Sequence, residues 1–270
     1  MKELRRRCPN IVITIKSIAL IKLYNFLLTN YFNKKHFFDA LFLGTISAIV
    51  SQGFNFLVTI LINRHLGSST MGQFAIIQSI VMMLITFGIL GQNVSATALT
   101  SRFSKRYPNQ LGNLIGNSYL ISFISTFATA FIAILIAKSV FRELYISSIP
   151  RSVSLLLCLV WFITMTFDMM QASILIGMQA YKDLVKTDIL KGFFALLIIY
   201  PFSIKFGLAG VLIGYVGVYS MGLAINQWFI RKNLNNLKVS INFKPNRKLI
   251  KIILNFGLPI FIAAMFMGPT

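Results

Sequence analysis

The chain has 270 residues, of which 56% are hydrophobic and only 12% are charged, and its mean hydropathy is +0.76. This composition excludes a soluble domain with a solvated surface and is typical of a polytopic membrane protein. The net charge of +20 comes from Lys and Arg residues that flank apolar stretches without an aromatic-interleaved basic patch, so we expect no nucleic-acid partner.

A basic leader, residues 1–36, precedes the long apolar stretches. Lys16 and Lys22 interrupt its apolar run, and no small-residue cleavage site follows, which excludes a signal peptide. If the leader spanned the bilayer, inserting each lysine near the bilayer centre would cost about 2.5 to 3.5 kcal/mol. We therefore expect an interfacial helix on the cytoplasmic leaflet.

Beyond the leader, apolar stretches of about 20 residues recur, which is the length needed to cross a hydrocarbon core. The predicted fold class is all-α, a polytopic membrane protein with about seven transmembrane helices. Their predicted ranges are 37–62, 73–99, 114–137, 152–177, 189–206, 208–230 and 250–268. The loops between them are too short to hold a folded catalytic domain.

The distribution of positive charge predicts the topology. With a cytoplasmic N-terminus, 21 Lys and Arg residues fall on inner segments and 5 on outer segments, as the positive-inside rule requires. In this count Lys182, Lys186 and Lys191 form one inner group, although Lys191 lies just inside the span predicted from residue 189.

The first two predicted spans form a hairpin that carries polar side chains at membrane depth. An unpaired polar group is costly in hydrocarbon, so these side chains must face partner helices or a wet cavity. The candidates for a substrate pathway are Gln52, Asn55, Gln78, Gln92 and Asn93, with Arg64 in the outer turn and Arg102 at the inner face. Hydrogen-bonded packing is the alternative for the amides, and interfacial anchoring or topology explains the two arginines equally well.

Asp168 is the acid deepest within a predicted span, with Gln171 on the same helical face. An intramembrane carboxyl is expensive and is by default a functional candidate, either as a counter-charge or as a protonatable coupling group. The alternative is a protonated carboxyl that only hydrogen-bonds a neighbouring helix. Asp168 and Gln171 are therefore the coupling candidates.

Two G-x-x-x-G pairs occur, Gly112 with Gly116 and Gly210 with Gly214. Such pairs let membrane helices approach closely, and a hinge is the alternative. The only cysteines, Cys8 and Cys158, supply neither a disulfide framework nor a metal quartet, and no signature of a catalytic site occurs. We expect no enzyme activity, no cofactor and no metal.

The outer turn resembles a known family. The residues Asn-Arg-His-Leu-Gly at 63–67 and Met-Gly-Gln-Phe at 71–74 resemble the pattern after the first helix of the polysaccharide transporter family. These are the Wzx-type flippases of O-antigen and other lipid-linked oligosaccharides, in the multidrug/oligosaccharidyl-lipid/polysaccharide exporter superfamily. Further motifs resemble the family in the same order, at 87–91 leading to Arg102, 176–181, 206–210 and 255–259.

The resemblance implies a lobe of six helices like the N-terminal lobe of a multidrug and toxic compound extrusion (MATE) transporter. The predicted organisation is a leader at 1–36, the lobe at 37–230, a basic cytoplasmic loop at 231–249 and the start of a second lobe at 250–270. Because the last span stops as it should reach the outer face, we expect a truncated chain.

The implied function is flipping of a polyprenyl-diphosphate-linked oligosaccharide across the bacterial inner membrane by alternating access. The implied partners are this lipid-linked oligosaccharide, membrane lipids, and a glycan polymerase or other assembly proteins. The alternatives are a drug/cation antiporter of the same superfamily, a membrane-embedded enzyme of glycan assembly, and a scaffold that binds other membrane proteins.

Overall fold

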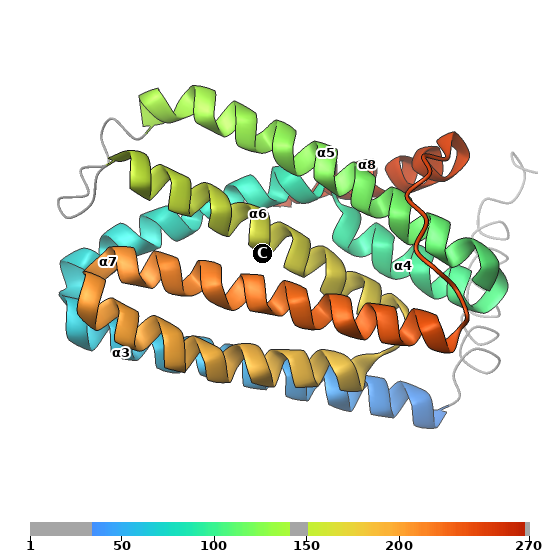
Figure 1. Cartoon of the computed structure of the whole chain (residues 1–270), viewed down its shortest axis with the longest axis horizontal. Helices are drawn as coiled ribbons and strands as arrows, with labels where there is room; N and C mark the ends of the chain where they lie inside the picture. Colours follow the sequence, from blue (N-terminus) through green and yellow to red (C-terminus); the bar gives the residue numbers. More distant parts are fainter. Residues whose placement is uncertain (1–33, 141–150, 268–270) are drawn as a thin grey trace, which may run out of the picture. The chain divides into compact units, whose positions relative to one another are not determined.

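A computed structural model describes residues 34–140 and 151–267, and its elements are all α-helices (Figure 1). They are α3 (Lys34–Ile89), α4 (Gln92–Arg106), α5 (Pro108–Val140), α6 (Arg151–Gly177), α7 (Tyr181–Asn236) and α8 (Arg247–Met267). No strand occurs in this part of the chain, so the predicted all-α class is confirmed. Residues 1–33 of the predicted leader lie outside the described residues. Residues 46–270 form one unit, separate from residues 1–45, and the contacts below lie within it.

Helices α3 and α7 each turn back on themselves. Each has 56 residues, about 84 Å of helix at 1.5 Å per residue, whereas a hydrocarbon core is about 30 Å thick. The reversals occur at Gly67 and Gly207, whose φ angles are 79° and 57°. A positive φ suits glycine because it has no Cβ. The predicted turn of residues 63–72 is therefore helical on both sides of one glycine, and residues 68–89 and 208–236 form return arms.

The second predicted span, 73–99, is broken in the structure. The helix stops after Ile89, and Leu90 and Gly91 have φ angles of 46° and 68° before α4 begins at Gln92. A Cβ on Gly91 would lie 2.3 Å from the Gly257 carbonyl oxygen of α8, so no larger residue fits. The Ser125 hydroxyl of α5 donates to the Gly88 carbonyl at 2.5 Å. This bond satisfies an acceptor that the break frees, which is how membrane proteins tolerate interrupted helices.

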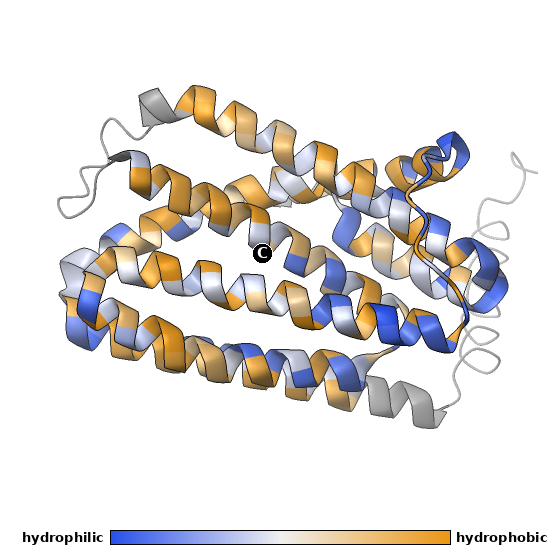
Figure 2. Ribbon diagram, viewed as in Figure 1, coloured by the Kyte–Doolittle hydropathy of each residue, from blue (hydrophilic) through white to orange (hydrophobic). Residues whose placement is uncertain are grey.

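Four described helices are long and apolar enough to cross a membrane, namely Phe42–Ile89, Pro108–Ile136, Ser152–Gly177 and Tyr181–Asn236. Because the first and last double back, these helices supply six crossing segments, and α8 follows them in the chain. Figure 2 shows apolar residues along the helices and polar residues gathered near the segment that joins α7 to α8. The protein is a polytopic membrane protein, as predicted.

Successive connections between the crossing segments lie at alternate ends of the helices, as the sequence predicts. The reversals of α3 and α7 lie at one end of the helices, whereas the α4–α5 and α6–α7 junctions and the segment joining α7 to α8 lie at the opposite end (Figure 1). Which end faces the cytoplasm stays a prediction.

Two apolar clusters hold the helices together. The first joins α3, α6 and α7 around the buried Trp161, whose ring stacks on Tyr215 at 4.9 Å and on Phe74 at 6.0 Å between centroids. The second joins α4, α5, α8, the end of α6 and the end of α7. Large apolar side chains on the outer face of α5 are exposed, among them Phe123, Ile124, Phe127 and Phe131. Such side chains suit contact with lipid tails.

The two G-x-x-x-G pairs have different roles. Gly214 packs on Ile199 across the two arms of α7, so close helix packing is confirmed for that pair. The first pair instead faces the segment 237–246, because a Cβ on Gly112 would lie 1.9 Å from the Ser240 carbonyl oxygen and one on Gly116 would lie 2.0 Å from that of Asn242. The prediction of helix-to-helix packing is wrong there, since the partner is a non-helical backbone.

Candidate functional site

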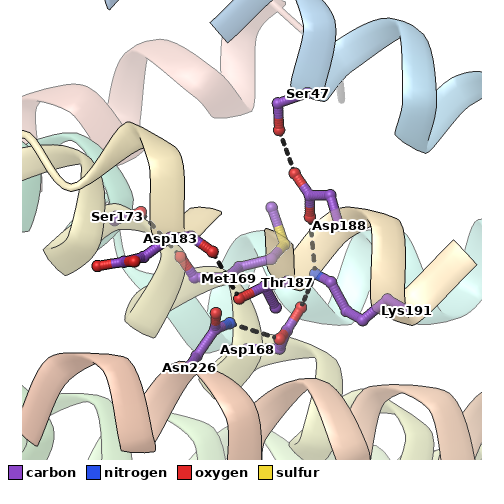
Figure 3. A network of polar contacts seen from close by, with 9 residues as sticks. All are labelled: Ser47, Asp168, Met169, Ser173, Asp183, Thr187, Asp188, Lys191 and Asn226. Carbon is purple, nitrogen blue, oxygen red and sulfur yellow. Dashed lines mark hydrogen bonds and ion pairs between the residues drawn. The ribbon is translucent and has the colours of Figure 1, made fainter. Parts of the chain in front are cut away.

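Asp168 is buried on α6 and is held by side chains of both arms of α7 (Figure 3). The Asn226 amide donates to one carboxylate oxygen at 2.9 Å, and the Lys191 ammonium donates to the other at 3.1 Å. A carboxylate with an ammonium partner is stable in its charged form at a depth where an isolated charge is costly. Asp168 is thus half of a buried ion pair.

Lys191 bridges two carboxylates. Its ammonium nitrogen also lies 3.2 Å from Asp188, one turn earlier on the same arm of α7. The other oxygen of Asp188 accepts a hydrogen bond from the Ser47 hydroxyl of α3. We call Ser47, Asp168, Asp188, Lys191 and Asn226 the charged cluster; with two carboxylates and one ammonium, its formal charge is −1.

The charged cluster lies several helical turns from the nearest helix ends. Asp168 is nine residues before the end of α6, and Lys191 is ten residues after the start of α7, so each lies about 14 or 15 Å along its helix from that end. Lys191 lies within α7, and the span predicted from residue 189 also contains it. The helix begins at Tyr181, eight residues before the predicted start.

A small cavity adjoins the charged cluster. Its volume is about 50 Å³, measured over positions that the centre of a water can occupy, and a single water needs about 10 to 15 Å³ by this measure. The lining residues include Ser51, Asn55, Asp188, Lys191, Tyr215 and Tyr219. The lining is mixed, since Phe54, Ile199 and Val218 also contribute to it, and its polar groups with room for water let a polar ligand group be solvated there.

Among the predicted pathway residues, Asn55 is the one that lines this cavity. The others lie elsewhere: Gln52, Arg64 and Arg102 are exposed, Gln78 and Asn93 are partly buried, and Gln92 is buried. The amide of Gln92 lies 3.1 Å from the Ser122 hydroxyl at the contact between α4 and α5. The structure therefore does not gather these seven residues at one site.

Gln171 belongs to a separate network. Its amide donates to the Gln227 side-chain oxygen at 3.0 Å, and the Tyr119 hydroxyl donates to the same oxygen at 2.8 Å. Although Gln171 shares a helical face with Asp168, the two side chains have different partners.

Sequence reasoning missed Ser47, Asp188, Lys191 and Asn226. One signal was present, because Asp188 and Lys191 stand at i and i+3, a spacing that pairs opposite charges on one helix. Placing the helix start at residue 189 hid this signal, since Asp188 then fell in a loop.

Comparisons with known proteins identify the family. The sequence profile of the family described as "Polysaccharide biosynthesis protein" matches residues 37–267. The chain belongs to that family. This confirms the resemblance to the polysaccharide transporters of the exporter superfamily. Curated proteins give no match.

Solved structures similar to this polysaccharide biosynthesis family member are transporters. An outward-facing MATE family multidrug resistance transporter has a TM-score of 0.66 and 20% identity, covering 82% of this chain and 51% of that one. A superfamily transporter from Pyrococcus furiosus, described as having a binding pocket of reverse polarity, has a TM-score of 0.63 and 21% identity, covering 82% and 50%. A MATE protein in the bent conformation has a TM-score of 0.66 and 19% identity, covering 87% and 54%.

These similarities show the fold. The chain has a MATE-like, all-helical fold, as predicted. It spans about half the length of these transporters.

Proposed function

We propose that this lobe is part of a flippase that moves a polyprenyl-diphosphate-linked oligosaccharide across the bacterial inner membrane by alternating access. A sugar-diphosphate head group cannot enter hydrocarbon, because its charges and hydroxyls would be unsatisfied there. A flippase therefore needs a polar cavity at membrane depth. The observation that carries the proposal is the cavity beside the charged cluster, in a chain of the polysaccharide biosynthesis family.

Alternating access requires two lobes that rock around a shared cavity. The proposal therefore concerns a two-lobe transporter to which this chain contributes the six-helix lobe. The proposed orientation has a cytoplasmic N-terminus, and the proposed partners are membrane lipids and a glycan polymerase or other assembly proteins. The proposed activity is transport and involves no enzymatic step.

A drug/cation antiporter is the second candidate, and one observation favours it. The charged cluster has a formal charge of −1, and a carboxylate-rich site attracts cations. The polyprenyl-diphosphate and cation hypotheses predict ligands of opposite charge.

The test is a binding measurement with the purified chain in nanodiscs of neutral lipid. A fluorescent polyprenyl-diphosphate oligosaccharide and the lipophilic cation ethidium are titrated separately. We expect saturable binding of the diphosphate lipid and none of ethidium. Saturable binding of ethidium without binding of the diphosphate lipid would replace the flippase proposal by the antiporter.

A further inference from the structure

We propose that Lys191 is the anion-binding residue of this lobe, and that its ammonium exchanges a carboxylate partner for the diphosphate of the lipid substrate. This inference rests on the proposed function and adds the residue that recognises the head group and the condition under which it binds. A phosphate oxygen is a strong acceptor for an ammonium donor.

The first argument is position. Lys191 lines the cavity, and its side chain is only 17% exposed. Every other Lys or Arg between residues 46 and 236 whose side chain the structure describes is exposed. Within that described part of the lobe, Lys191 is therefore the one cation that is partly buried and lines the cavity.

The second argument is donor capacity. An ammonium has three N–H donors, and Asp168 and Asp188 account for two of them in this structure. One donor remains for a ligand in the cavity. The cavity has room for a few waters, so an oxygen that approaches Lys191 displaces water instead of packed side chains.

The third argument is charge. With both carboxylates ionised the cluster is net negative and repels an anion, whereas protonation of one carboxyl makes it neutral and frees Lys191. The groups that surround the ammonium are Asp168 of α6, Asp188 of the same arm, and Tyr215 and Tyr219 of the return arm. The lining residues from α3 include the uncharged Ser51 and Asn55. Anion binding and proton uptake should therefore favour each other.

The test measures binding of a polyprenyl diphosphate to the full 270-residue chain in neutral-lipid nanodiscs at pH 6 and pH 8. Lys191→Gln is compared with the wild type, and Lys186→Gln is the matched control, because Lys186 is exposed on the same arm. A polyprenyl alcohol of equal length reports binding of the tail alone.

We expect Lys191→Gln to weaken binding by about 10- to 150-fold, the equivalent of one hydrogen bond to a charged group. Lys186→Gln should stay within about twofold of the wild type, as for a surface change away from the site. The wild type should bind more tightly at pH 6 than at pH 8. Asp168→Asn should bind more tightly than the wild type at pH 8, because one negative charge is gone.

Two further arms complete the design. Inorganic diphosphate is used as a competitor to separate the two sources of the anion. Competition indicates a site for diphosphate itself, and absence of competition indicates a site for the lipid-borne group. Binding that depends on Lys191 supports the inference in either case. Far-UV circular dichroism checks folding. If Lys191→Gln does not fold, the comparison uses Lys191→Arg, which should retain binding, and the Asp168→Asn/Lys191→Gln double variant, which should lose it.

The outcomes separate the inference from the proposed function. Equal binding of polyprenyl diphosphate by the wild type and by Lys191→Gln, or by the foldable double variant, would overturn the role of Lys191 and leave the flippase proposal standing. Absence of binding by the wild type at both pH values would overturn both.

Discussion

Replacing Lys191 by Gln should destabilise the lobe much more than replacing Asp168 by Asn, although the two side chains share one ion pair. The difference follows from Asp188, because Lys191 contacts both Asp168 at 3.1 Å and Asp188 at 3.2 Å. Removing the lysine leaves the buried Asp168 and the partly buried Asp188 without a counter-charge. Removing the Asp168 charge leaves Lys191 still paired with Asp188.

The magnitudes follow from these remaining contacts. Loss of one partner from a buried pair costs about 3 to 5 kcal/mol when a charge is left unpaired, which is the expectation for Lys191→Gln. In Asp168→Asn the new amide oxygen still accepts from Asn226, and only the bond to Lys191 weakens. We expect about 1 to 2 kcal/mol for that change. The double variant should be less destabilised than the sum of the single ones, because the residues are in contact.

The assay is equilibrium unfolding in mixed micelles with increasing denaturing detergent, followed by far-UV circular dichroism. Lys186→Gln serves as control and should change the free energy of unfolding by no more than about 0.5 kcal/mol. Equal destabilisation by Lys191→Gln and Asp168→Asn would refute the reasoning, because it would mean that Asp188 does not share the ammonium.

Three further outcomes are expected. In vesicles containing the proposed two-lobe transporter, Asp168→Asn should insert normally and lose gradient-dependent flipping, and normal gradient-driven flipping by this variant would remove its coupling role. Gly116→Ala should destabilise the chain by about 1 to 3 kcal/mol, because the new Cβ would lie 2.0 Å from the Asn242 carbonyl oxygen. Gly53→Ala has open space around it and should stabilise the helix by about 0.5 to 1 kcal/mol. Unfolding midpoints in the opposite order would contradict the packing. Reporter fusions should be active for outer compartments near residue 68 and not near residue 240, and the reverse would invert the predicted topology.

The membrane fold was predictable because hydrocarbon imposes a simple rule on length and polarity. Apolar stretches of crossing length identified the helices, and the Gly-containing turns near 67 and 207 marked the reversals. The break at Leu90 and Gly91 was not predictable in the same way. It depends on a close approach of Gly257 and on a hydroxyl from Ser125, and both lie far from it in the sequence.

The site was predictable only in part. Asp168 was identified because a buried acid is costly wherever its partners lie. Its partners come from the two arms of α7, and no periodicity within α6 indicates which residues of another helix face it. Lys191 was missed because positive charges near the end of an apolar run are ordinarily topology charges. A lysine and an aspartate one turn apart inside a span have the same local pattern as a surface pair.

The segment that joins α7 to α8 determines what α8 is attached to. If its ten residues, 237–246, formed a flexible linker, their root-mean-square end-to-end distance would be about 16 to 19 Å. Such a linker would leave the position of α8 variable. Instead, the Asn117 side chain of α5 donates to the Lys244 carbonyl at 3.3 Å and accepts from the Asn246 backbone at 2.8 Å. The Asn246 side chain in turn accepts from the Lys248 backbone in the first turn of α8 at 3.0 Å. The start of α8 is therefore fixed to α5 through the Asn117 side chain, which contacts the backbone immediately before α8.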